Sequence, residues 1–218
     1  MTMTAKGTAL LVIPAAVLVG SAGLLAGFAP APAGESASAT ENAAAAYKVD
    51  AVHSTVLFKI RHAGVSNFYG VFGDFSGTFT FDPESPKSGS FEFEVQTASV
   101  DTRNTSRDDH LRNADFFNSR QFPTITFKST GVEHKEGNLY ELRGDLTLQG
   151  ETKPITAELE WIGTGTNQRG QGTAGYEARF SIKRSDFGMT KYLAPDGSDS
   201  GGLGNTVDLT VAVEAVQG

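Results

Sequence analysis

From Tyr47 onward, apolar and polar residues alternate with a period of two, which is the pattern of half-buried β-strands. Eight segments show this alternation, and most are joined by short turns rich in glycine, proline or polar residues. They cover residues 56–62, 69–81, 91–96, 124–129, 140–148, 155–161, 176–182 and 207–213. Eight antiparallel strands with one apolar face each fit a closed up-and-down barrel better than two open sheets.

The second of these segments is long and contains several glycines, so we expect a strongly bent strand. One face of this strand is predicted to carry Tyr69, Val71, Phe75, Phe79 and Phe81.

A polar segment between the third and fourth predicted strands interrupts the alternation. Within it, Ser106 is followed three residues later by Asp109, a capping-box pattern that predicts a short helix. Pro123 then favours an extended entry into the fourth strand. We therefore expect a short helical flap lying across or beside the barrel.

The first 46 residues differ from the rest of the chain. Lys6 precedes an uncharged apolar run over residues 7–29, and small-residue sites follow, as in an export signal. As a helix this run would measure about 35 Å, enough to span a bilayer, so an uncleaved membrane anchor is the alternative. Residues 30–46 are rich in Ala, Pro and Ser and predict a flexible linker. The expected order is signal or anchor 1–29, linker 30–46 and barrel domain 47–218, in the periplasm or secreted.

Composition narrows the function classes. The 218 residues, 39% apolar and 20% charged, are ordinary for a globular protein that can bury a core. A net charge of -7 without a basic run argues against nucleic acid as a partner. The chain has no cysteine, so the fold of this exported protein must be stabilised without disulfides.

An eight-stranded barrel encloses either a packed core or a slot for one small ligand. The chain has 15 Phe, 5 Tyr and one Trp, which either fill the barrel or line an elongated apolar tunnel. Periodicity leaves both readings open. The inward residues expected to form the wall of such a tunnel are Val56, Phe58, Ile60, Phe75, Phe79, Phe91, Phe93, Phe127, Leu142, Leu146, Trp161, Phe180 and Leu209.

Polar candidates are few. No pair of the four histidines has the spacing of a zinc site, so we predict no metal site. His62, expected on the inward face, is either a satisfied buried histidine or a polar group that meets a ligand at the barrel end. In the flap, Arg107 and Arg112 either cap and pair with acidic neighbours or bind a ligand head group. Phe116 and Phe117 are either a lid or an anchor that fixes the flap to the barrel.

Three stretches carry a resemblance to a known family: HSTVLFKIRHAGVSNFYGVFGDFSG from His53, RDDHLRNADFFNSRQFPTITFKST from Arg107, and GDLTLQGETKPIT from Gly144. Together with DFG at residues 186–188 and the closing VDLTVAVEA, they closely resemble the YceI-like family. The likeness runs in order through essentially all of residues 47–216.

The resemblance implies an exported, lipocalin-like barrel of eight antiparallel strands whose pore binds a polyisoprenoid lipid, such as an isoprenoid quinone or a polyprenyl phosphate. It implies storage or transport outside the cytoplasm, with no cofactor and no catalysis. No Ser or Cys has a recognisable nucleophile motif around it. Two alternatives stay open: a lipid-modifying enzyme with His62 or His110 as a base, and a solidly packed, stress-related structural barrel. Whether the barrel forms a homodimer also stays open.

Overall fold

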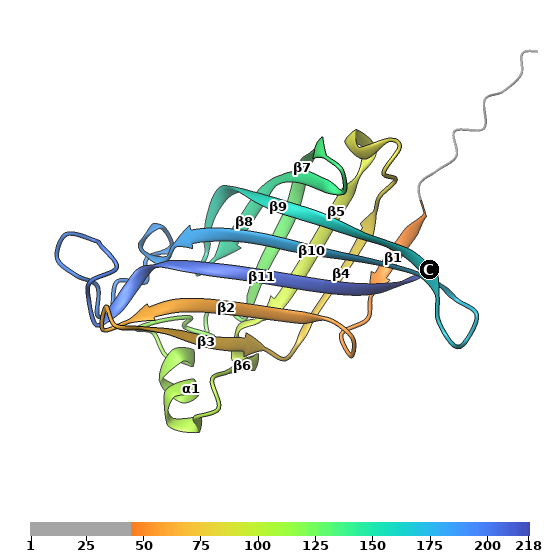
Figure 1. Ribbon diagram of the computed structural model, residues 1–218. Helices are drawn as coiled ribbons and strands as arrows, with labels where there is room; N and C mark the ends of the chain where they lie inside the picture. Colours follow the sequence, from red (N-terminus) through yellow and green to blue (C-terminus); the bar gives the residue numbers. More distant parts are fainter. Residues whose placement is uncertain (1–44) are drawn as a thin grey trace, which may run out of the picture. The chain divides into compact units, whose positions relative to one another are not determined.

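The structure is a computed structural model that describes residues 45–218 (Figure 1). The predicted signal or anchor and nearly all of the predicted linker lie outside the described residues. The strands are β1 (Ala46–Val49), β2 (Thr55–His62), β3 (Ser66–Phe72), β4 (Phe75–Thr80), β5 (Ser90–Gln96), β6 (Val100–Asp101), β7 (Thr124–Glu136), β8 (Leu139–Leu148), β9 (Glu151–Thr166), β10 (Gly172–Lys183) and β11 (Leu203–Gln217). One α-helix, α1 (Thr105–Arg112), and three 3-10 turns at Pro86–Ser88, Thr97–Ser99 and Arg184–Phe187 complete the described part.

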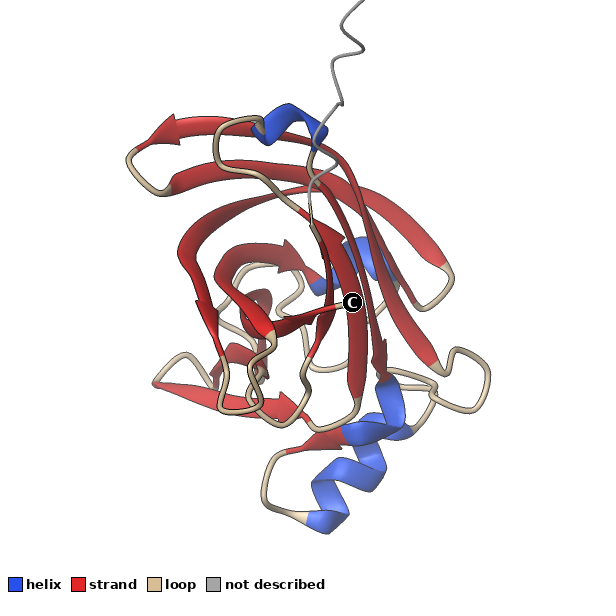
Figure 2. Cartoon of the chain, turned by 90° about the vertical axis from the view of Figure 1, so that its right-hand side faces the viewer, coloured by secondary structure: helices blue, strands red, loops and turns tan. Residues whose placement is uncertain are grey.

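The strands form a closed antiparallel barrel. The sheet order is β1-β4-β5-β7-β8-β9-β10-β11-β2-β3-β6, and an additional pairing of β1 with β11 closes the ring. The long strand β11 pairs with β2 along its first part and with β1 at its end. Both β1 and β2 pair with β11, so together they act as one of the eight strands of the barrel. In the same way β3 and β4 make up the second strand of the barrel, and β5 and β6 make up the third. The predicted eight-stranded barrel, with a helical flap between its third and fourth strands, is confirmed (Figure 2).

The alternation of inward and outward side chains shifts by one residue at Gly73 and Asp74, between β3 and β4. In β3, Phe68 and Phe72 face the interior while Tyr69 is 50% exposed. In β4, the buried residues are Phe75 and Phe79. Two residues instead of one therefore separate the inward Phe72 and Phe75, and an extra residue moves all later side chains to the opposite face. The prediction that Tyr69 and Val71 share a face with Phe75 was wrong for this reason.

Helix α1 begins earlier than its sequence pattern suggests. The N-cap is Asn104, whose side-chain oxygen accepts a 3.0 Å hydrogen bond from the Arg107 amide. Ser106 lies inside the first turn, so the capping box expected at Ser106 and Asp109 was wrong. Asparagine is as good an N-cap as serine, so either residue could have started the helix.

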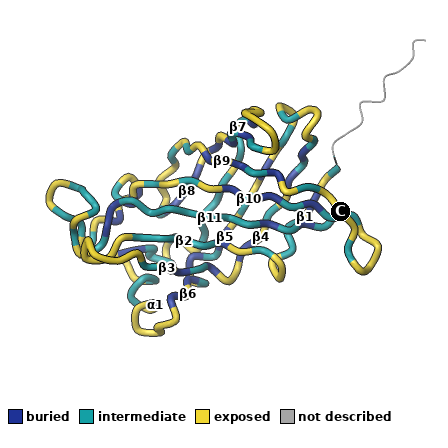
Figure 3. The backbone as a smooth tube through the Cα atoms, in the orientation of Figure 1, coloured by how far each residue is buried: buried dark blue, intermediate teal, exposed yellow. Residues whose placement is uncertain are grey.

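One end of the barrel is filled by side chains, and we call it the aromatic end. Seven buried rings gather there, from strands β1, β4, β5, β8, β9, β10 and the turn after β4: Tyr47, Phe79, Phe81, Phe91, Tyr140, Trp161 and Tyr176. They meet edge to face, tilted or stacked, with the Phe79 and Phe91 centroids 5.4 Å apart, and each stacked or edge-to-face pair is worth about 1 kcal/mol beyond its burial. Exposed positions are concentrated in the connecting loops and in the flap (Figure 3).

Within residues 45–218, no helix has the length and apolarity needed to cross a membrane.

Candidate ligand cavity

The barrel encloses a cavity of about 200 Å³ whose lining is almost entirely apolar. On β10 alone, Tyr176, Ala178, Phe180 and Ile182 line it in alternation. Residues six apart on a strand are separated by about 20 Å, so the cavity is elongated along the barrel. A barrel filled solidly by its side chains, one of the alternatives above, is not what the structure shows.

Ten of the thirteen predicted wall residues line this cavity: Val56, Phe58, Ile60, Phe91, Phe93, Phe127, Leu142, Leu146, Phe180 and Leu209. The other three are buried elsewhere. Phe79 and Trp161 belong to the aromatic end, and Phe75 stacks on Phe93 with ring centroids 5.7 Å apart. Contact of any of these residues with a ligand stays a prediction.

Sequence reasoning missed part of the wall. Phe68 and Phe72 line the cavity but were not among the predicted wall residues, because the extra residue after β3 has no clear sequence signal. Val95 and Ile125 follow the same alternation as their predicted neighbours and could have been included. Arg184 also lines the cavity, and no pattern in the neighbouring sequence predicts that this arginine is buried.

Two wall phenylalanines lie on glycines of the neighbouring strand. A methyl group at Gly70 would lie 2.3 Å from Cζ of Phe58, and one at Gly144 would lie 2.4 Å from the ring of Phe127. Such separations are far below van der Waals contact. The glycines therefore let the rings lie against the wall, which keeps them out of the cavity centre.

The flap covers the wall between β6 and β7, where the chain leaves the sheet. Arg107 lines the cavity: its Nε donates to Thr102 Oγ1 at 2.8 Å, and its guanidinium lies 4.3 Å from the Phe68 ring centroid. Arg112 does not line it. It donates to the carbonyl oxygens of Ala98 and Val100 and pairs with Asp109. Of the two predicted flap arginines, only Arg107 is at the cavity.

Phe116 and Phe117 both line the cavity, so each is part of the wall as well as of the flap. Phe116 is 5% exposed and its ring meets His110 edge to face. Phe117 meets Phe72 edge to face at 5.4 Å, which ties the flap to β3. Phe117 thus has the contact of an anchor to the barrel, and a role of the pair as a lid stays a prediction.

None of the four histidines lines the cavity. His62 is the last residue of β2 and is exposed, because the strand ends there and the chain turns at Ala63 and Gly64. The expectation of a buried His62 was wrong, and its contact with a ligand at the barrel end stays a prediction. His110 contacts Asp115 at 3.2 Å, and Lys191 approaches the same carboxylate at 3.0 Å. The hydrogen bond from His110 is the largest cause that lowers the pKa of Asp115.

The fold brings together three possible metal ligands that are distant in sequence. Ligand atoms of Asp50, His53 and Glu214 lie within 4.8 Å of one another at the surface. A 2.9 Å hydrogen bond joins His53 to Asp50, and it is the main cause that raises the pKa of His53. This ordinary ion-pair geometry accounts for the cluster, and the absence of a metal site stays a prediction.

Three buried residues with polar groups also line the cavity: Thr102, Tyr176 and Arg184. Burial raises the pKa of the Tyr176 hydroxyl, so this phenol stays neutral. Arg184 is 2% exposed, and its guanidinium donates to the carbonyl oxygens of Gly204, Met189 and Leu203 at 2.7 to 3.1 Å. Burial lowers its pKa.

Comparison with known proteins agrees with this architecture. The family model described as a YceI-like domain matches residues 47–215. Protein YceI of Escherichia coli O6:H1 is 44% identical over 182 residues, which cover 83% of this chain and 91% of that protein.

Two solved structures show the same fold. BcnA of Burkholderia cenocepacia is 24% identical with a TM-score of 0.67, over 76% of this chain and 98% of BcnA. A polyisoprenoid binding domain from Saccharophagus degradans is 16% identical with a TM-score of 0.57, over 80% of this chain and 99% of that domain. On the family match and the identity to YceI, the chain belongs to the YceI-like family.

Proposed function

We propose that this protein binds a polyisoprenoid lipid, with the isoprenoid chain inside the barrel, for storage or transport outside the cytoplasm. The observation that carries the proposal is the elongated apolar cavity. The structural neighbour from Saccharophagus degradans, described as a polyisoprenoid binding domain, supports the same ligand class.

The physical argument is the burial of apolar surface. Each Å² of hydrocarbon removed from water contributes about 25 cal/mol, so a long chain binds tightly without strong polar contacts. The rings packed on Gly70 and Gly144 lie against the wall, which leaves the centre of the cavity free for such a chain. The proposal assigns binding without turnover, because no His, Ser, Asp or Glu among residues 45–218 lines the cavity.

The test is organic extraction and mass spectrometry of the full chain purified from a bacterium that exports it. We expect a prenyl lipid at close to one equivalent, recovered chemically unchanged. The matched variant is Ala178→Trp, which places a large ring in the cavity and should abolish the bound lipid. The control is Ala212→Trp, at the opposite face of the sheet on β11, which should keep it.

A protein that copurifies empty and takes up neither added quinones nor polyprenyl phosphates would contradict the proposal. Recovery of a modified lipid that accumulates with time would favour the enzyme alternative. Export is tested on the same cultures: the intact mass of the periplasmic or secreted protein shows whether a signal has been removed.

A further inference from the structure

The charged residues that line the cavity all have the same sign. Among residues 45–218, thirty line it, and the only charged ones are Arg107 and Arg184. No carboxylate lines it, although the whole chain carries a net charge of -7. An apolar cavity with two guanidinium groups and no acidic group has a positive potential, which favours an anion.

Arg184 is buried without a counter-ion. No carboxylate of the described residues lies within 4.0 Å of its nitrogens, and its three partners are neutral carbonyl oxygens. A guanidinium has five N–H donors, so three hydrogen bonds leave two donors free. Holding an unpaired charge in an apolar interior is unfavourable, and an anion placed beside it would offset much of that cost.

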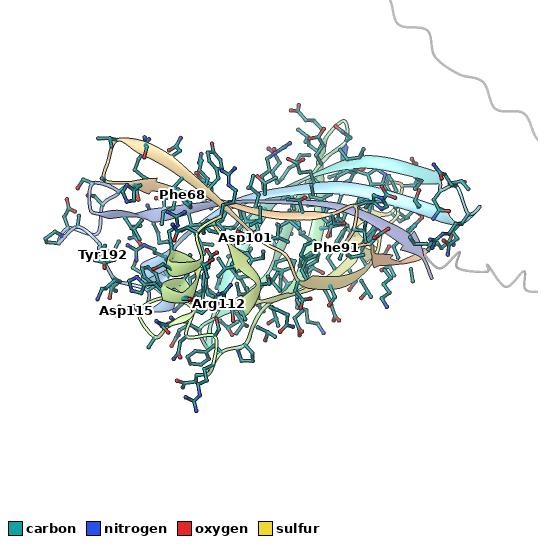
Figure 4. All side chains as sticks on the ribbon, turned by 90° about the horizontal axis from the view of Figure 1, so that it is seen from below. Phe68, Phe91, Asp101, Arg112, Asp115 and Tyr192 are labelled. Atoms are coloured by element: carbon teal, nitrogen blue, oxygen red, sulfur yellow. The ribbon has the colours of Figure 1, made fainter. Side chains whose placement is uncertain are left out.

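Arg107 lies at the same end of the barrel. It stacks on Phe68, whose strand partner is Ile60, and Ile60 pairs in turn with Val207 of β11. Arg184 is held by Gly204 and Leu203, at the start of that same strand β11. The two arginines therefore flank the end opposite to the aromatic end. Figure 4 shows the labelled Phe68 and Tyr192 toward this end and Phe91 farther along the barrel.

The nearby acidic groups have their own partners. Asp108 accepts hydrogen bonds from the amide and the hydroxyl of Thr102. Asp199 accepts from the amide and the hydroxyl of Thr206, and Asp115 pairs with Lys191. Neither arginine is in a salt bridge with any of them within the part of the chain that the structure describes.

We propose that Arg184 and Arg107 form an oxyanion-binding end of the cavity, so that the ligand is an acidic lipid with its hydrocarbon tail toward the aromatic end. This inference rests on the proposed function and adds the class of head group, a phosphate or a carboxylate. Guanidinium groups bind both through paired, charge-assisted hydrogen bonds.

The test compares ligands that share a tail and differ only in the head group. Geranylgeranyl phosphate is measured against geranylgeraniol, and palmitate against hexadecanol, by displacement of a fluorescent apolar probe from the full-length protein. We expect the anion to bind about tenfold more tightly than its alcohol in at least one pair, since a charge-assisted pair is worth more than a neutral hydrogen bond. The pair with the larger ratio distinguishes phosphate from carboxylate.

Two variants test whether Arg107 and Arg184 cause the preference for the anion over the alcohol. Arg107→Gln, an exposed substitution at the cavity rim, should reduce the ratio toward one, and Arg184→Gln should reduce it further. Arg120→Gln is the matched control: it removes an exposed flap arginine that does not line the cavity, and it should leave the ratio unchanged. If Arg184→Gln does not fold, the ratio of anion to alcohol affinity in the wild type and in Arg107→Gln still tests the proposal.

Equal affinity of the wild type for anions and alcohols would overturn the oxyanion site while leaving lipid binding intact. Failure of all four ligands to bind would overturn both. A ratio that survives in both variants would show that Arg184 only holds the chain between Met189 and Gly204 in place.

Discussion

At the scale of single residues, the cavity depends on glycines in its wall as much as on the aromatic residues that line it. Phe58 lies on Gly70 and Phe127 on Gly144, and a single methyl group at either glycine would collide with the ring. The ring would then have to rotate into the cavity or push the strands apart. A substitution at either glycine should therefore lower the stability of the protein and reduce the cavity volume together.

Gly144→Ala should therefore destabilise the protein by about 1 to 3 kcal/mol, the usual cost of overpacking a well-packed interior. Ligand affinity should fall in the same variant, because the displaced Phe127 ring occupies the cavity. Gly131→Ala is the control on the partner strand, where a methyl group would meet no atom closer than 3.7 Å. Urea unfolding of both variants measures the difference, and equal stability would show that the ring is not held by Gly144.

The alternation of apolar residues predicted most of the wall correctly at this scale, including Phe91, Phe93 and Phe180. It failed where one extra residue reverses the inward and outward faces, since Gly73 and Asp74 look like an ordinary part of a bent strand. It also failed for Arg184, because burial of a charge depends on carbonyl groups that only the folded loop brings near.

At the scale of elements, α1 is the part of the fold least able to stand alone. It has eight residues, and isolated helices of this length are not stable in water. Its cap, the contact of Asp108 with Thr102 and the hydrogen bonds of Arg112 to the chain before and within β6 hold it in place. The sequence predicted that a helix interrupts the strands, but two good capping residues near one another left its start uncertain by two positions.

Asn104→Ala should cost about 1 kcal/mol, because an unpaired amide remains at the first turn. Ser106→Ala should change stability by much less, although the sequence pattern nominated Ser106 as the cap. Thermal or urea unfolding of the two variants checks this order. A larger loss in Ser106→Ala would mean that the helix starts where the pattern suggested.

At the scale of the whole molecule, the sequence was sufficient for the fold. Eight apolar faces, short turns and a single interruption have one simple arrangement, a closed barrel, and the pairing of β1 with β11 completes it. Alternation alone could not tell a filled barrel from a hollow one, because both place aromatic residues inside. The difference lies in how the rings are oriented, which only the three-dimensional arrangement determines.

A hollow barrel should be more stable when its ligand is present. At a ligand concentration 100 times the Kd, binding contributes about 2.7 kcal/mol, and for a domain of this size that raises Tm by about 5 to 10 °C. Circular dichroism melts of delipidated protein with and without geranylgeranyl phosphate measure the shift. Ala178→Trp should melt at the same temperature in both, and a wild type without a shift would contradict a ligand cavity.

The aromatic end has a consequence for how a lipid would enter and leave the cavity. Because buried rings fill the aromatic end, a lipid bound as proposed would enter and leave the cavity through the opposite end. Donor and acceptor would then have to use the same face of the protein in turn and could not hold it at the same moment. Under the proposed function, such a molecule would carry one lipid at a time between partners and would not form a continuous channel between two membranes.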